Sequence, residues 1–103
     1  MKLSIDECID ERLRVSFFDH DCSTPRFAGL KNGSLLAAAE AAGFEVLITV
    51  DQNIPNQQNL TERRLSILIL RAKTNRLRDL IELVPLANDA LKLIGYGNVI
   101  VIS

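Results

Sequence analysis

The sequence predicts a single domain of the α/β class, residues 1–103, with a mostly parallel sheet of four or five strands. Two observations lead to this prediction. Short apolar runs alternate along the chain with segments of helical periodicity, an order typical of parallel strands joined by right-handed crossovers. In addition, runs such as ILIL (67–70) and NVIVI (98–102) are apolar at nearly every position, which indicates strands that are buried on both faces.

Local patterns place the elements of the first half of the chain. Ile9, Leu13 and Phe17 recur at i, i+4 and i+8, which favours a helix. The run SLLAAAEAA consists mainly of strong helix formers and is stopped by Gly43. The run VLITV that follows is apolar or β-branched throughout, as in a buried strand. The expected order is a strand at 2–5, a helix at 9–18, a short strand at 20–24, a helix at 33–42 and a strand at 45–50.

The second half continues the alternation after a long, amide-rich loop at 52–62, a length that is more often functional than idle. Asn75 is expected to cap a helix, because apolar residues recur at helical spacing behind it. Pro85 either kinks this helix or starts a second one at its first position. The expected elements are a strand at 65–71, a helix from 75, a helix from 85 to about 94 and a final strand in YGNVIVIS.

Composition and charge restrict the classes of function. The chain is 48% apolar and 24% charged, and its net charge of −1 gives no overall attraction to nucleic acid. No apolar run approaches the roughly 20 residues that span a bilayer. The N-terminus MKLSIDEC lacks the apolar core of a signal peptide, so a cytoplasmic location without membrane attachment is expected.

Acidic side chains follow two of the expected strands. Asp6 and Glu7 come directly after the first strand, and Asp51 follows the run VLITV. Ligands of open parallel sheets bind at the carboxyl ends of the strands, so acids on neighbouring strands would lie close together. Carboxylates held that close repel one another and are stabilised by a cation, for which Mg²⁺ or Mn²⁺ with oxygen ligands is the natural choice. A bound ion of this kind orients a phosphate and activates a water.

Simpler roles stay open for these residues. Asp6 and Asp51 could cap helices or turns through their side-chain acceptors. Glu7 could equally be a metal ligand or an ordinary surface residue. Asp10 is expected to cap the first helix. Asn53 begins the polar loop and could be a turn residue.

The soft ligands of the chain do not form a recognisable zinc motif. Cys8, His20 and Cys22 supply three potential ligands, but their spacing matches no zinc site and a fourth ligand is missing. Structural packing of reduced cysteines is therefore the expected role.

The charges are unevenly distributed along the chain. Nine of the 13 acids fall within residues 1–51, whereas six of the 12 basic residues lie between 63 and 78. One interpretation is that these are solvated faces of ordinary helices. The other is an acidic pocket beside a basic rim, in which Arg71, directly after the fourth strand, contacts phosphate.

Three segments resemble the short bacterial PIN-like proteins, a branch of the PIN-domain superfamily: LSIDECIDERL, AGLKNGSLLAAAEAAGFEVLITVDQNIPNQQNL and LSILILRAKTNRLRDLIELVP. The resemblance covers nearly the whole chain. It implies a Rossmann-like three-layer α/β/α sandwich. It also implies a link to Mg²⁺- or Mn²⁺-dependent ribonucleases, many of which are toxins paired with an antitoxin protein, and it suggests a homodimer.

When the family's pattern is carried over by position, Asp6 matches the acid that closes the first strand. Asp51 matches the acid that closes the strand after the second helix. Two positions depart from the family pattern. Asn32 stands where relatives commonly have an acid before the second helix, and Asn53 stands where they often have a second acid after the Asp51 position. Amides can ligate a metal through oxygen but carry no charge, so the predicted ligand set binds weakly. Glu7 or Glu40 could compensate, although Glu40 could equally be a helix-surface residue.

Two functions from different classes remain. In the first, the chain is an endoribonuclease, either a toxin or a housekeeping enzyme. Asp6 and Asp51 are then the catalytic metal ligands, helped by Glu7, Asn32 and Asn53. Arg71, Lys73 and Arg76 contact the RNA backbone. In the second, the chain is a catalytically silent PIN-like module that binds a protein partner or nucleic acid.

Overall fold

The computed structural model describes residues 1–17, 19–23, 32–52 and 63–103. The elements are listed here in chain order, with η1 a 3₁₀ helix: β1 (Lys2–Ile5), η1 (Glu11–Phe17), β2 (Asp21–Ser23), α1 (Asn32–Ala41), β3 (Val46–Thr49), β4 (Ser66–Leu70), α3 (Leu77–Ile81), α4 (Val84–Leu91) and β5 (Val99–Ile102). The alternation of strands and helices predicted from the sequence is confirmed.

The five strands form one sheet in the order β2-β1-β3-β4-β5, and every pairing is parallel. This confirms the prediction of a parallel sheet of four or five strands. Beginning at β1, the chain builds outward to β2 on one side and then returns to build β3, β4 and β5 on the other. The strand order therefore reverses between β1 and β3, and ligands of doubly wound sheets bind at the carboxyl end of such a switch point.

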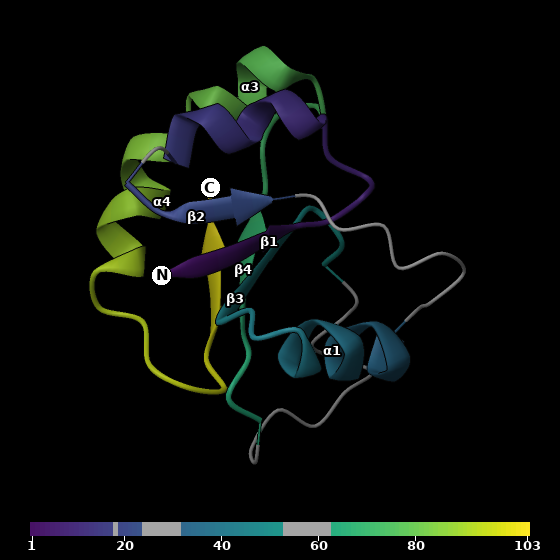
Figure 1. Ribbon diagram of the computed structural model, residues 1–103. Helices are drawn as coiled ribbons and strands as arrows, with labels where there is room; N and C mark the ends of the chain where they lie inside the picture. The colour runs from purple at the N-terminus through teal and green to yellow at the C-terminus, as the bar shows by residue number, and fades with distance from the viewer. Residues whose placement is uncertain (18, 24–31, 53–62) are drawn as a thin grey trace.

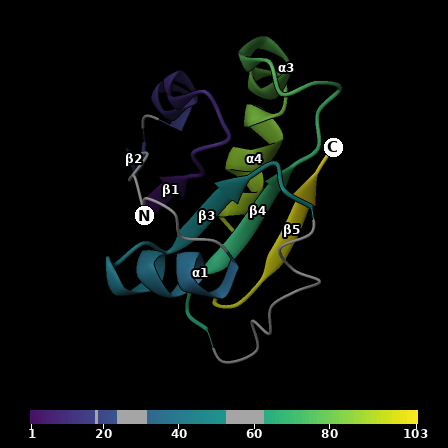
Figure 2. The same cartoon turned by 90° about the vertical axis from the view of Figure 1, so that its right-hand side faces the viewer.

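Two hydrophobic clusters cover the two faces of the sheet and complete a three-layer α/β/α sandwich (Figures 1 and 2). On one face, η1, α3 and α4 pack over β1, β3 and β4 through buried residues such as Phe17, Leu80 and Leu91. On the other, α1 contributes Leu36 and Ala39 against β3 and β4. All residues of β3 and β4 are buried, as the continuous apolar runs of these strands predict.

The helices differ from expectation at two places, and at a third the structure decides between two predicted alternatives. The segment predicted as a helix over 9–18 forms a 3₁₀ helix over Glu11–Phe17. Asn75 is not the cap of α3: Arg76 occupies that position without a side-chain capping bond, and the Thr74 hydroxyl accepts the Arg76 N–H at 3.1 Å. Pro85 lies in the first turn of α4, so the predicted second helix begins there.

The amino edge of the sheet is tied together by polar contacts. Gly43 ends α1 with a φ of +88°, a conformation that favours glycine. The Lys2 ammonium donates to the Ala42 carbonyl at 2.7 Å and lies 4.6 Å from the centroid of the Phe44 ring. The buried Ser66 hydroxyl donates to the Gly95 carbonyl at 2.5 Å and accepts the Asn98 N–H at 3.0 Å. These contacts fix the loops that enter the strands.

Within the described ranges, no helix has the length and apolar character needed to cross a membrane.

Candidate functional site

Asp6 lies at the switch point, directly after β1. Its backbone N–H donates to the Ile48 carbonyl of β3 at 2.9 Å, and its own carbonyl accepts the Ile9 N–H at 3.0 Å. The β-ladder therefore continues into Asp6 before the chain turns away. These two backbone hydrogen bonds fix the position of Asp6, which is half-buried.

Thr49 organises the site around the Asp6 carboxylate. It is the last residue of β3 and is completely buried. Its hydroxyl donates to Oδ2 of Asp6 at 2.7 Å and accepts the backbone N–H of Asp51 at 3.1 Å. The carboxylate of Asp6 and the backbone of Asp51 thus meet on one hydroxyl, as expected for acids at the carboxyl ends of adjacent strands. We call Asp6, Thr49 and Asp51 the switch-point cluster.

Cys8 borders the switch-point cluster. Its sulfur lies 4.0 Å from the Thr49 hydroxyl oxygen. Partial burial of the thiol and the nearby Asp6 charge raise the pKa of Cys8 above its ordinary value. Because the thiol stays protonated at neutral pH and a thiolate is the form that binds metal, the switch-point cluster presents oxygen ligands.

The other predicted metal ligands differ in placement. Glu7 is exposed beside Asp6, and Asp51 is also exposed. The side chain of Asn32 and the whole of Asn53 lie outside the described residues. Glu40 does not join Asp6: its carboxylate accepts the Leu65 N–H at 3.5 Å and lies 3.7 Å from the Arg63 guanidinium, before β4 and therefore at the opposite edge of the sheet.

The predicted RNA-binding residues follow β4, the neighbour of β3. The backbone N–H of Arg71 donates to the Ile102 carbonyl at 2.8 Å, which places Arg71 at the carboxyl edge. Arg71, Lys73 and Arg76 are all exposed, and they lie in the segment between β4 and α3. Basic side chains therefore begin one strand away from Thr49.

The soft ligands do not come together. Cys8 lies at the carboxyl edge, whereas His20 immediately precedes β2 and so lies at the amino edge. Cys22 is half-buried, and burial raises the pKa of its thiol to about 11. Cys22 packs against the hydrophobic core, as expected, whereas Cys8 is exposed. Asp10 caps η1 as predicted, since its carboxylate accepts the Arg12 N–H at 3.0 Å; hydrogen bonds from Arg12 lower the pKa of Asp10 to about 2.

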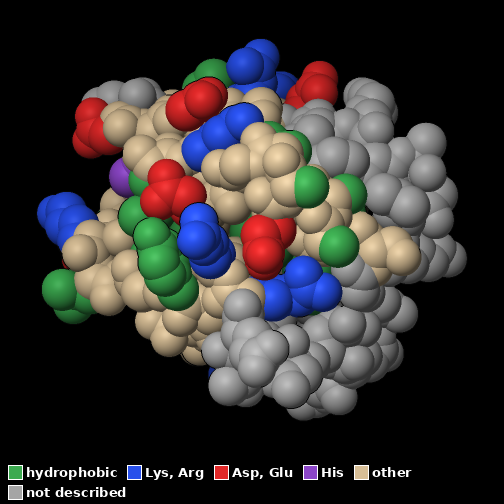
Figure 3. Space-filling model, turned by 60° about the horizontal axis from the view of Figure 1, so that its bottom comes forward, with side chains coloured by type: hydrophobic (Ala, Val, Ile, Leu, Met, Phe, Trp, Pro, Cys, Tyr) green, Lys and Arg blue, Asp and Glu red, His purple; other side chains and the backbone are tan. Residues whose placement is uncertain are grey.

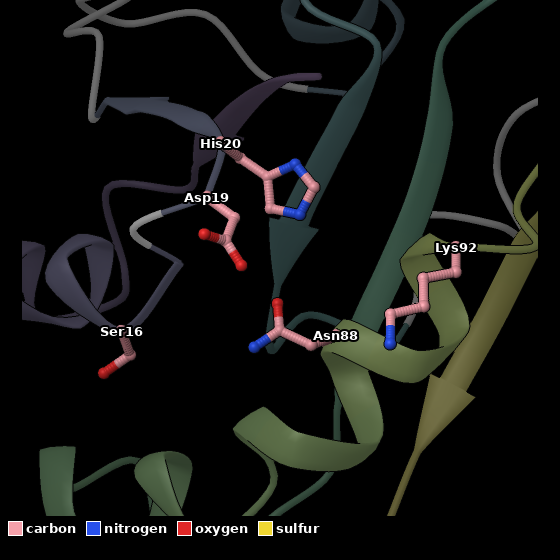
Figure 4. Close-up of a pocket in the computed structure, with 5 residues that line it drawn as sticks. All are labelled: Ser16, Asp19, His20, Asn88 and Lys92. Atoms are coloured by element: carbon pink, nitrogen blue, oxygen red, sulfur yellow. The ribbon is translucent and has the colours of Figure 1, made fainter.

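A separate hollow of about 310 Å³ lies between the start of β2 and α4, and is lined by Ser16, Asp19, His20, Asn88 and Lys92 (Figure 4). Within the described part of the chain, the buried His20 Nδ1 atom has no hydrogen-bond partner. None of the described residues predicted for metal or RNA binding is among those that line this hollow. Figure 3 shows that, on one described face, acidic and basic side chains are intermixed with hydrophobic ones.

Oxygen-donor chemistry at the switch-point cluster fits a hard divalent ion. Mg²⁺ is usually held by one or two carboxylates and keeps several of its waters, so Asp6 and Asp51 are the residues that could hold it. In the part of the chain that the structure describes, no group of three or more His, Cys, Asp or Glu side chains is placed to bind a metal. An ion at this edge would therefore have a small protein ligand set.

Sequence reasoning missed Thr49. It counted as one β-branched residue in a buried strand, although a hydroxyl buried on such a strand needs a hydrogen-bond partner. Thr49 stands two residues before Asp51, so its need for a partner is the signal that could have linked Asp51 to Asp6.

The fold and the switch-point cluster define a doubly wound α/β protein with an acidic residue oriented at its topological switch. No protein-family model, curated protein or solved structure matches the chain.

Proposed function

We propose that the chain is a PIN-like endoribonuclease that uses Mg²⁺ or Mn²⁺ bound by Asp6 and Asp51. The observation that carries this proposal is the Thr49 hydroxyl, which binds the Asp6 carboxylate and the Asp51 N–H at the switch point. A buried hydroxyl holds the carboxylate in one orientation before any ligand arrives, and pre-set oxygen ligands reduce the ordering that binding requires.

The chain's own residues would divide the work in a simple way. Asp6 and Asp51 would hold the ion, which when bound supplies an activated water and neutralises phosphate charge. Arg71, Lys73 and Arg76 would hold the RNA backbone from the β4 side, because exposed guanidinium and ammonium groups bind phosphate oxygens. A toxin paired with an antitoxin is one biological setting for such an enzyme.

One observation favours the alternative, a catalytically silent module that binds a protein or nucleic acid. Among the described residues, no three His, Cys, Asp or Glu side chains gather closely enough to hold a metal ion. The alternative differs from the nuclease in its response to a divalent ion, which the following experiment measures.

Mn²⁺ is expected to stabilise the wild-type protein, because a ligand that binds only the folded state adds about 2.7 kcal/mol at a hundredfold excess over Kd. Asp51→Asn and Asp6→Asn should lose this gain and any cleavage of RNA. Thermal melting with and without Mn²⁺ measures the first effect, and a fluorescent single-stranded RNA measures the second.

Asp89→Asn is the matched control, since Asp89 is an exposed acid on α4 with 74% of its side chain accessible. It should keep the full response to Mn²⁺. A wild-type melting curve that is indifferent to millimolar Mn²⁺ would refute the metal site. Stabilisation by Mn²⁺ without cleavage of any RNA would favour the silent module.

The basic segment should give RNA binding a steep dependence on salt, because each phosphate contact releases counterions. Replacing Arg71 and Arg76 with glutamine should weaken binding. It should also reduce the slope of log K against log salt by about 1.4, at about 0.7 per contact with a single strand. Titration of the RNA at several salt concentrations measures both quantities.

Arg14→Gln combined with Lys92→Gln removes the same charge from exposed positions on η1 and after α4. This control should leave the slope unchanged. Equal losses in both double variants would show that the attraction is spread over the surface, in agreement with solvated helix faces.

A further inference from the structure

β5 is an edge strand: among the described residues, β4 pairs with its inner side and no strand pairs with its outer side (Figure 2). On the inner side, the Ile67 N–H donates to the Asn98 carbonyl and the Arg71 N–H to the Ile102 carbonyl. Alternate residues of a strand direct their backbone groups to opposite sides. Val99 and Val101 therefore direct their N–H and C=O groups outward, away from β4.

The same two residues carry exposed apolar side chains. Val99 is 39% exposed and Val101 is 48% exposed. They are in register with Ile67 and Ile69 of β4, and so lie on the face of the sheet that α1 covers. Ile102, by contrast, belongs to the core under α4, and Ile100 packs against that core. At Val99 and Val101, outward-directed backbone groups and exposed apolar side chains thus occur together.

The two edges of the sheet differ in their protection. Natural edge strands are blocked by charged residues, proline, bulges or very short length. The edge strand β2 has three residues and carries the exposed Asp21. The edge strand β5 has four residues, VIVI, with no charge and no proline. Nothing in the β5 sequence therefore opposes the addition of another strand.

The β5 edge is complementary to a copy of itself. If two copies pair antiparallel about a two-fold axis through Ile100, Val99 of one copy lies opposite Val101 of the other. Each such pair exchanges both of its N–H···O bonds, so positive N–H ends meet negative C=O ends along the edge. The facing valine side chains then pack as cross-strand pairs.

We propose that β5 is a homodimer interface, in which two copies join their sheets edge to edge through antiparallel β5 strands. The assignment does not depend on the nuclease proposal, because Val99 and Val101 lie one strand beyond β4 and take no part in the switch-point cluster. Antiparallel pairing would direct the two carboxyl edges, and hence the two clusters, to opposite ends of the joined sheet.

Sedimentation velocity over a range of concentrations tests this interface. The wild-type protein should sediment as a dimer, and Val101→Lys should sediment as a monomer, because lysine on an edge strand opposes pairing. Val101→Pro should do the same, since proline removes one outward N–H and is tolerated on an edge strand. Circular dichroism should show that both variants keep the wild-type fold.

Ile81→Lys is the control, because Ile81 on α3 has a similar exposure of 44%. It should remain a dimer. A monomeric wild type at its highest soluble concentration would overturn the proposal. It would do so even if β5 accepts a strand from another protein instead. A dimer that survives both folded Val101 variants would also overturn it. If Val101→Lys fails to fold, Val101→Pro and the wild-type mass decide the result.

Discussion

Replacing Thr49 with valine is expected to lower the free energy of unfolding by about 3 kcal/mol. Valine has nearly the same shape, so the substitution leaves the packing of β3 in place and removes the hydroxyl alone. Two groups then lose a partner: the Asp6 carboxylate and the Asp51 N–H. A hydrogen bond contributes about 0.5–1.5 kcal/mol to stability, and one to a charged group contributes about 1.5–3 kcal/mol. Urea unfolding followed by circular dichroism measures the change.

Thr74→Val supplies a matched control, because it removes the same atom from an exposed threonine whose hydroxyl binds Asp79 and the Arg76 N–H. Water can replace those bonds, so the loss should stay below about 1 kcal/mol. Equal losses in the two variants would contradict a special role for Thr49. Under the nuclease proposal, Thr49→Val should also reduce the stabilisation by Mn²⁺, since Asp6 would no longer be held in position.

Leu68→Ala is expected to have the largest effect on stability, a loss of about 4 kcal/mol. Leu68 is fully buried in the middle of β4 and belongs to the cluster that β1, β3, η1 and α4 share. Its truncation removes buried methyl groups and leaves a cavity, for which measured costs run from about 2 to 5 kcal/mol. Both terms act together because the neighbouring strands cannot collapse without shifting the sheet. Chemical denaturation gives the value directly.

Leu93→Ala makes the same chemical change at a residue that is 88% exposed, and its effect should be within about 0.5 kcal/mol of zero. If Leu68→Ala cost as little as Leu93→Ala, β4 would not be the centre of the core. A reduced m-value in Leu68→Ala would indicate that the cooperativity of unfolding has changed as well.

Most of the fold follows from local sequence patterns, because each apolar run is long enough for one strand and each helix has its own periodicity. The runs at Ser66–Leu70 and Val46–Thr49 predicted buried central strands, and both are fully buried. The failures have local causes. Glu11–Phe17 forms a 3₁₀ helix, and apolar periodicity alone does not separate the two kinds of helix. At the start of α3, the Thr74 hydroxyl rather than the Asn75 side chain accepts the Arg76 N–H.

The candidate site was predictable only where topology fixes it. Parallel strands bring their carboxyl ends to one edge, so Asp6 and Asp51 could be placed near each other from the sequence. The hydrogen bond from Thr49 to Asp6 could not be predicted, because the two residues lie 43 positions apart. Their contact depends on the strand order and register. Glu40 could not be assigned from the sequence: its type allowed a ligand or a helix-surface residue, and in the structure its carboxylate lies near Leu65 and Arg63.

The hydrogen bonds of Ser66 have a consequence for how the chain can diversify. Ser66 joins the start of β4 to Gly95 and Asn98 at the amino edge, whereas the switch-point cluster lies at the other edge. These structural ties and the switch-point cluster therefore occupy opposite edges of the same sheet. Substitutions and loop exchanges after the strands can accumulate without loosening the entry loops. New binding properties can arise in this chain while its scaffold stays intact.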